Sequence, residues 1–187
     1  MIEIENSLRK FVSTCKKHAL SGSFGVIDDL DNLFPANLPH STEMDYFYKK
    51  FNPEKLKIET GFTPIKIYSI TELAKAQNGY AYFPVNYIVI GDDYGGGKPI
   101  IAVVDGELTA IYANYDVGVP LKIADSFSSF ILSLTELIDL VYGDYNIFDI
   151  ADDNDEVNKD FIAELKKRIV PLIGTENFIA FYDYFYG

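Results

Sequence analysis

Apolar residues recur along this chain at two spacings, and each spacing predicts its own kind of element. Intervals of three and four residues place apolar side chains on one face of an amphipathic helix. They predict helices at 2–20, 42–51, 71–78, 126–141, 157–170 and 176–186. Alternating or short continuous apolar runs are typical of strands. They predict strands at 56–60, 65–69, 87–90, 99–104 and 108–112.

The clearest strand signals lie between residues 87 and 118. Asp105-Gly106 separates two of the apolar runs, and this dipeptide is a strong signal for a two-residue hairpin turn. Three consecutive glycines, 95–97, precede the run that begins at Pro99, and glycine adopts positive φ without a steric penalty. We therefore expect a three-stranded antiparallel meander. The predicted fold class is α+β, a mainly antiparallel sheet with helices packed on one side.

The C-terminal part of the chain predicts a helical extension over 143–187. Pro171 and Gly174 are expected to break it, because proline lacks an N–H group and glycine favours helix ends. Thr175 is then in place to cap a last, aromatic helix, as Thr71 is for the short helix that follows it. The whole chain, 1–187, is expected to form one domain. Whether the extension packs on the rest is left open.

Composition narrows the classes of function. The chain has 48% hydrophobic residues, which indicates a globular fold. Its formal net charge of −12 argues against a nucleic-acid ligand or an anionic membrane surface and favours a basic protein partner. Cys15 is the one cysteine, so no intrachain disulfide can form, and we expect a buried, inert thiol. No signal peptide or membrane span is predicted, so we expect a cytoplasmic protein.

The sequence contains no complete motif for binding a cofactor or a metal ion. The glycine run before Lys98 lacks the phosphate-loop spacing, and Pro99 stands where a hydroxyl residue is needed. His18 and His40 have no zinc-type partners. The acidic stretch 149–160 lacks the glycine of a calcium loop. No G-x-S-x-G nucleophile motif is present. We therefore expect no cofactor, no metal and no enzyme activity.

Acidic and tyrosine residues gather at the turns and strand ends of the meander. Loops concentrate binding residues, and tyrosine is enriched in interfaces. The predicted partner-binding residues are Asp92, Asp93, Tyr94, Asp105, Glu107, Tyr112, Tyr115 and Asp116. A second acidic group contains Asp152, Asp153 and Asp155. Two alternatives stay open. These side chains either solubilise turns and complete the core, or include a carboxylate pair that serves hydrolysis.

The order of these elements resembles a known family. A helical ITELAKAQNGY at 70–80 leads to a strand that ends in IGDD at 90–93. A glycine-rich turn, two hairpin strands and a helix beginning SFSSF at 126–130 follow. Together with Leu38-Pro39 upstream, this pattern resembles the SMI1/KNR4 (SUKH) superfamily over residues 34–141. The chain has no tryptophan, so the family's tryptophan-bearing motif is absent.

The resemblance implies a binding protein. Bacterial members of this superfamily resemble immunity proteins that bind and neutralise a cognate toxin, often a nuclease. Eukaryotic members resemble regulatory scaffolds that bind cellular proteins. The first expectation is therefore toxin neutralisation through a stoichiometric interface with a basic toxin, and the alternative is a scaffold with a cellular protein partner.

Overall fold

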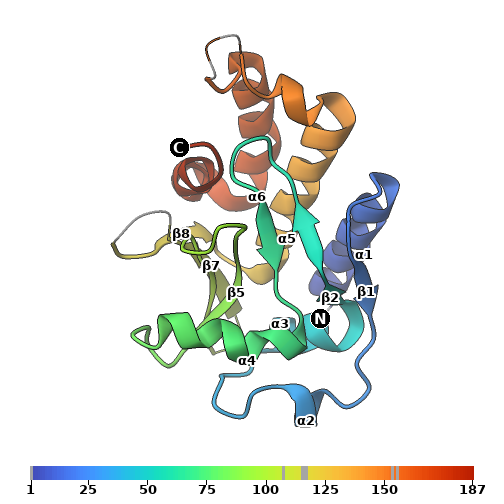
Figure 1. Cartoon of the computed structure of the whole chain (residues 1–187), viewed down its shortest axis with the longest axis vertical. Coiled ribbons are helices and arrows are strands. Elements are labelled where there is room, and N and C mark those ends of the chain that lie inside the picture. Colours follow the sequence, from blue (N-terminus) through green and yellow to red (C-terminus); the bar gives the residue numbers. More distant parts are fainter. Residues whose placement is uncertain (1, 107, 115–117, 153, 155) are drawn as a thin grey trace.

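A meander of antiparallel strands forms the larger sheet of the molecule (Figure 1). The computed structural model describes residues 2–106, 108–114, 118–152, 154 and 156–187. Within these residues six strands pair in chain order: β3 (Leu56–Ile58), β4 (Ile65–Ile67), β5 (Tyr87–Asp93), β6 (Ile100–Asp105), β7 (Leu108–Ala113) and β8 (Leu121–Ala124). The predicted α+β class with a mainly antiparallel sheet is confirmed.

Six helices complete the fold of the described residues. They are α1 (Ile2–Lys17), α2 (Leu30–Leu33), α3 (Thr42–Phe51), α4 (Ile70–Ala76), α5 (Phe127–Ile138) and α6 (Lys159–Tyr186). Short 3-10 turns, η1 (Gln77–Tyr80) and η3 (Ile147–Asp149), follow α4 and precede α6, and a π-helical turn, η2 (Asp139–Asp144), continues α5. All the predicted helices are present.

The predicted β6–β7 hairpin is present, but its two-residue connection begins at Gly106 and not at Asp105. Asp105 pairs with Leu108, which leaves a two-residue connection, and Gly106 has a φ of +67°. That backbone region favours glycine. Every second residue of these strands then faces the core, where Ala102 and Ile111 are fully buried.

Three strands were absent from the sequence prediction. β8 pairs with β7, and β1 (Ser23–Gly25) pairs with β2 (Asn52–Glu54) in a separate two-stranded sheet. The sequence analysis predicted no strand at 23–25, 52–54 or 121–124. These strands were missed because three- and four-residue strands are too short to show an alternating pattern, and their pairing is decided by contacts distant in sequence.

Local hydrogen bonds define where the helices begin. The Ser41 hydroxyl accepts a hydrogen bond from Met44 N at 3.3 Å and caps α3. Before α4, Glu72 Oε2 accepts from Ser69 N at 3.0 Å and from the Ser69 hydroxyl at 2.8 Å. The predicted cap at Thr71 is therefore wrong by two residues, because Ser69 with Glu72 forms the capping box.

The edge of β5 is completed by a side chain. β4 is short, so residues 87–90 of β5 extend beyond it. Gln77 fills this place: its Oε1 accepts from Val89 N and its Nε2 donates to Val89 O, both at 2.9 Å. The side-chain amide thereby satisfies backbone groups that a longer β4 would have paired.

The C-terminal extension bends at one residue. Gly174 has a φ of 81° and a ψ of 165° inside α6, and this conformation divides α6 into two helical halves. The predicted pair of helices is confirmed, but the predicted break at Pro171 is wrong. The chain continues as a helix through Pro171 and changes direction at Gly174, because glycine adopts that backbone region without strain.

The extension packs on the core. Phe161, Leu165 and Phe181 are fully buried. The Tyr184 hydroxyl donates to Lys98 O at 2.7 Å, in the turn between β5 and β6, and the Tyr186 hydroxyl donates to Thr60 O at 3.0 Å. Figure 1 shows the second half of α6 beside the strand ends, on the side of the sheet away from α4.

Candidate protein-binding surface

Five aromatic side chains form a continuous layer at the outer face of the sheet. We call Tyr80, Tyr82, Phe83, Tyr87 and Tyr112 the aromatic surface. The Tyr80 and Phe83 rings stack with centroids 5.5 Å apart and an interplanar angle of 8°. Phe83 lies 4.8 Å from Tyr82 and 5.8 Å from Tyr87, and Tyr87 lies 6.3 Å from Tyr112.

Strand register places Tyr87 and Tyr112 on this face. Ile88 and Ile111, their neighbours in sequence, are fully buried on the opposite, helix-covered face. Because side chains alternate along a strand, Tyr87 and Tyr112 point outward. Both are half-buried.

The segment before β5 supplies the other rings. Phe83 N donates to Tyr80 O and Tyr87 N donates to Pro84 O, both at 2.9 Å, so this segment folds into two successive turns. The turns leave Tyr82 73% exposed and Val85 90% exposed. Large exposed apolar groups in one patch are typical of binding sites.

Buried apolar residues support this layer from the sheet. Val89 and Ile101 form a cross-strand pair on the outer face, and both are fully buried. Neither belongs to the main core cluster beneath the helices. Beneath the aromatic surface, the sheet therefore has a second, smaller area of buried apolar side chains.

One carboxylate organises the glycine-rich turn between β5 and β6. Asp92 is 2% exposed. Its Oδ1 accepts hydrogen bonds from the N–H groups of Asp93, Gly97 and Lys98 at 2.9, 3.1 and 2.9 Å. Its Oδ2 accepts from the Tyr80 hydroxyl at 2.6 Å. The prediction of Asp92 as a direct partner contact is therefore corrected: it is a buried group that joins the turn to the aromatic surface.

Burial is the largest cause of a raised pKa at Asp92. Hydrogen bonds from Tyr80 and Gly97 act in the opposite direction, and Asp93 adds to the rise. A raised pKa beside a second carboxyl is a feature of hydrolase sites. Here, however, both oxygens of Asp92 already accept hydrogen bonds, Oδ1 from the turn and Oδ2 from Tyr80. This geometry gives Asp92 a structural role and does not favour the hydrolase alternative.

Asp93 and Tyr94 occupy the open side of the same turn. Asp93 Oδ2 accepts from Gly95 N at 3.1 Å and its Oδ1 accepts from Lys98 N at 3.0 Å. Tyr94 is 51% exposed, and the ammonium group of Lys57 lies 4.1 Å from its ring centre. The Tyr94 ring is accessible to a partner.

Two predicted residues, Asp105 and Tyr112, face outward on the side of the sheet that carries the aromatic surface. Asp105 follows Ile101 and Val103 by even steps along β6, so it faces outward and is exposed at the end of the strand. Leu108, its cross-strand partner, is 64% exposed and belongs to the same row as Tyr112. The structure thus brings Asp105 to the rim of the surface that contains Tyr112.

The other predicted residues are not part of this surface as described. Asp152 lies between η3 and α6, where its Oδ1 accepts from Asn154 N at 2.8 Å and from Glu156 N at 3.2 Å. This segment lies at the end of the molecule away from α4 (Figure 1). The remaining predicted residues lie outside the described part of the chain: Glu107, Tyr115, Asp116, Asp153 and Asp155.

Sequence analysis missed four of the five aromatic residues. Tyr80, Tyr82, Phe83 and Tyr87 belong to the segment YAYFPVNY at 80–87. Tyr87 was predicted only as the first residue of a strand, and none of the four was predicted as a binding residue. The density of aromatic residues in an otherwise turn-forming segment was the available signal.

Other sites receive less support from the structure. Cys15 is buried, as predicted, and burial raises the pKa of its thiol to about 12. Among the described residues, His, Cys, Asp and Glu side chains form no group of three or more that could hold a metal ion. In the same part of the chain, none of the helices has the length and apolar character needed to cross a membrane.

Comparison with known proteins identified no relative of this chain. The chain matches no family model, no curated protein and no solved structure. The resemblance to the SMI1/KNR4 superfamily therefore rests on the sequence pattern alone.

Proposed function

We propose that this chain is a non-enzymatic protein-binding module and that the aromatic surface is its contact area. The observation that carries the proposal is the continuous layer of five rings with Tyr82 73% exposed. Tyrosine supplies large contact area with little conformational entropy to lose, and it is enriched among the residues that dominate binding energy. Contacts between the rings hold them in place before a partner binds, which favours preorganisation.

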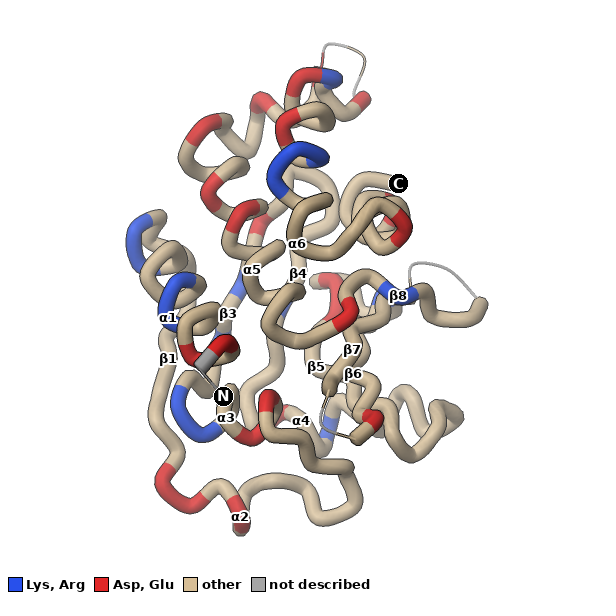
Figure 2. Tube along the Cα trace, turned by 180° about the vertical axis from the view of Figure 1, so that it is seen from behind, with Lys and Arg blue, Asp and Glu red and all other residues tan. Residues whose placement is uncertain are grey.

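The partner that fits best is a basic protein, and the resemblance supports a bacterial toxin as that partner. The chain carries a formal net charge of −12. Figure 2 shows acidic residues on α6, on the segment between α5 and α6, and near α2. Such a field accelerates encounter with a cationic protein, while apolar contacts set the lifetime of the complex. Neutralisation follows if the bound module covers the basic cleft of a toxin such as a nuclease.

The test combines capture with single substitutions on the surface. Tagged protein is used to isolate partners from the source cell at low and at high salt. The captured protein is then tested for basic charge, for toxicity when expressed alone, and for rescue by co-expression. Tyr82→Ala should weaken the complex by about 2 kcal/mol, the size of an interface hot spot.

The matched control is Phe148→Ala. Phe148 is 88% exposed and lies in η3, outside the aromatic surface. The Phe148→Ala substitution should leave the affinity for the partner unchanged. Equal loss in both variants would contradict the assigned surface. A non-toxic partner that still depends on Tyr82 would instead support the scaffold alternative and contradict toxin neutralisation.

A further inference from the structure

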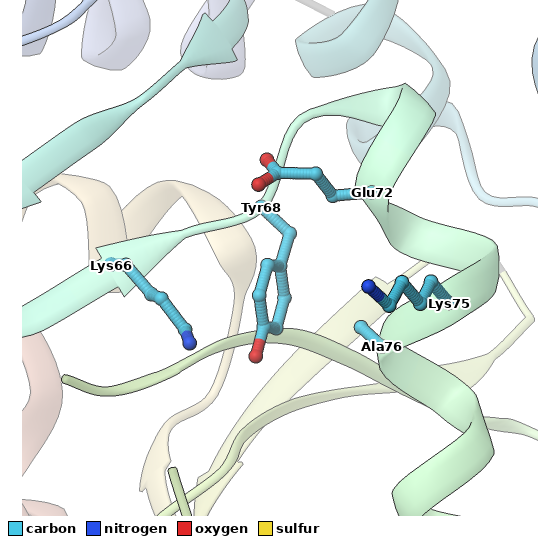
Figure 3. A pocket seen from close by; sticks show the side chains of 5 residues that line it. All are labelled: Lys66, Tyr68, Glu72, Lys75 and Ala76. Atoms are coloured by element: carbon cyan, nitrogen blue, oxygen red, sulfur yellow. The ribbon is translucent and has the colours of Figure 1, made fainter. Parts of the chain in front are cut away.

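A pocket of about 380 Å³ opens between β4 and α4, beside the aromatic surface. Its lining residues are Lys66, Tyr68, Glu72, Lys75 and Ala76 (Figure 3). Sequence analysis singled out none of them. The volume lies within the usual range for small-molecule sites.

Two ammonium groups face this pocket from different elements. Figure 3 shows Lys66 reaching from β4 and Lys75 from α4, one on each side of the Tyr68 ring. The Lys66 nitrogen lies 5.3 Å from the centre of that ring. Within the described residues neither lysine makes an ion pair. Two unpaired cations at one cavity are conspicuous in a chain with a net charge of −12.

The nearby carboxylates are held by other groups. Glu72 lines the pocket, but its Oε2 accepts two hydrogen bonds from Ser69 at the start of α4. Asp92 is the cross-strand partner of Lys66, but its carboxylate is buried in the bonds of the glycine-rich turn and of Tyr80. Neither acid therefore forms a contact ion pair with the lysines.

Tyr68 contributes a donor and an apolar wall. Its hydroxyl has no hydrogen-bond partner among the described residues. Burial, together with the charges of Asp92, Glu72 and Asp93, raises the pKa of Tyr68 to about 12. The hydroxyl thus stays protonated at neutral pH and can donate. The Tyr68 ring and the methyl group of Ala76 offer apolar area beside the charged groups.

We propose that this pocket binds the phosphate monoester of a small apolar group. The paired ammonium groups of Lys66 and Lys75 match a dianion better than a monoanion, because each can contact a different phosphate oxygen. The Tyr68 hydroxyl donates to a third oxygen. The ester group lies against the Tyr68 ring and Ala76. This site is independent of the proposed protein partner, although the two areas adjoin.

The test titrates the full chain with phenyl phosphate at low salt. Calorimetry gives the affinity, and amide chemical shifts locate the ligand. Saturable binding is expected, with shifts centred on residues 66–76. Lys66→Gln and Lys75→Gln should each weaken binding about fivefold, the size of an exposed charge interaction. Tyr68→Phe should weaken it about threefold, the low end for one hydrogen bond.

Lys50→Gln is the matched control. Lys50 is an exposed lysine on α3 that does not line the pocket. It should bind phenyl phosphate like the unmodified chain. If Lys50→Gln lost as much affinity as the pocket variants, the effect would be one of general charge and the proposed site would be overturned. The absence of saturable binding by the unmodified chain would also overturn it. Circular dichroism of every variant checks that the fold is kept.

Two further ligands test the chemistry. Benzoate carries one negative charge on the same ring, and inorganic phosphate lacks the apolar group. Both should bind more weakly than phenyl phosphate. Benzoate of equal affinity would overturn the preference for a dianion. Inorganic phosphate of equal affinity would overturn the role of the Tyr68 ring and Ala76.

Discussion

At the residue scale, the fold around the candidate surface depends most on Asp92. This carboxylate accepts three backbone N–H groups of the glycine-rich turn and the hydroxyl of Tyr80. The sequence DDYGGGK at 92–98 correctly predicts a tight turn. It does not predict burial of the first Asp, because acidic residues at turns are usually exposed. Burial follows from the length of β5, which extends through Asp93.

Asp92→Ala should lower the free energy of unfolding by about 2–4 kcal/mol. The substitution removes the acceptor of the part-buried donors Asp93 N, Gly97 N and Tyr80 Oη, and each donor left unsatisfied is costly, although Lys98 N keeps Asp93 as an acceptor. Urea denaturation measures the loss. Asp105→Ala removes an exposed carboxylate from the end of β6 and should change stability by less than about 0.5 kcal/mol. A small effect at both positions would contradict the structural role of Asp92.

At the element scale, α6 depends on the backbone of Gly174. Its φ of 81° and ψ of 165° fall in a region that residues with a Cβ rarely adopt. The sequence correctly predicts two helices here from Pro171 and Gly174. It does not show that Gly174 alone makes the bend. A proline within a helix is tolerated where neighbouring contacts hold both sides, and Ile169 and Ile173 are buried on either side of Pro171.

Gly174→Ala should destabilise the protein by about 1–3 kcal/mol through backbone strain. A Cβ at this position would meet nothing within 4 Å, so a steric clash is not the cause. Gly79 offers the matched control, since its surroundings are equally open and its φ lies outside the region that favours glycine. Gly79→Ala should be neutral or slightly stabilising. Thermal unfolding of both variants separates strain from the loss of glycine flexibility.

At the scale of the whole molecule, the sequence pattern predicts the helices and strands better than it predicts which of them pack against each other. Hydrophobic periodicity locates the helices and the central strands, because burial of one face is a local property. The pairing of β1 with β2 and the docking of α6 on the β5–β6 turn join segments distant in sequence. The aromatic surface also depends on contacts between segments distant in sequence, because Tyr80 and Tyr112 lie in one layer only after the sheet has formed.

The contact of α1 with the end of α5 is another such long-range pairing. Asp139 Oδ1 lies 2.8 Å from Lys17 Nζ and 2.7 Å from His18 Nε2. Burial alone would raise the pKa of Asp139, but Lys17 and His18 outweigh it and lower the pKa below the ordinary 3.8. A lowered pKa stabilises the folded state above the unfolded value, and that stabilisation is lost as the pH falls through the folded value.

Asp139→Asn should therefore cost about 1 kcal/mol of unfolding free energy at neutral pH, the upper end for a partly exposed pair. The difference from the unmodified chain should shrink between about pH 5 and pH 2, because Asp139 becomes neutral in that range and then resembles asparagine. Urea denaturation across this range measures the difference. Asp105→Asn, at an exposed site with no ion pair among the described residues, should show a small difference at every pH. A constant penalty at Asp139 would indicate that its hydrogen-bond geometry, and not its charge, joins α1 to α5.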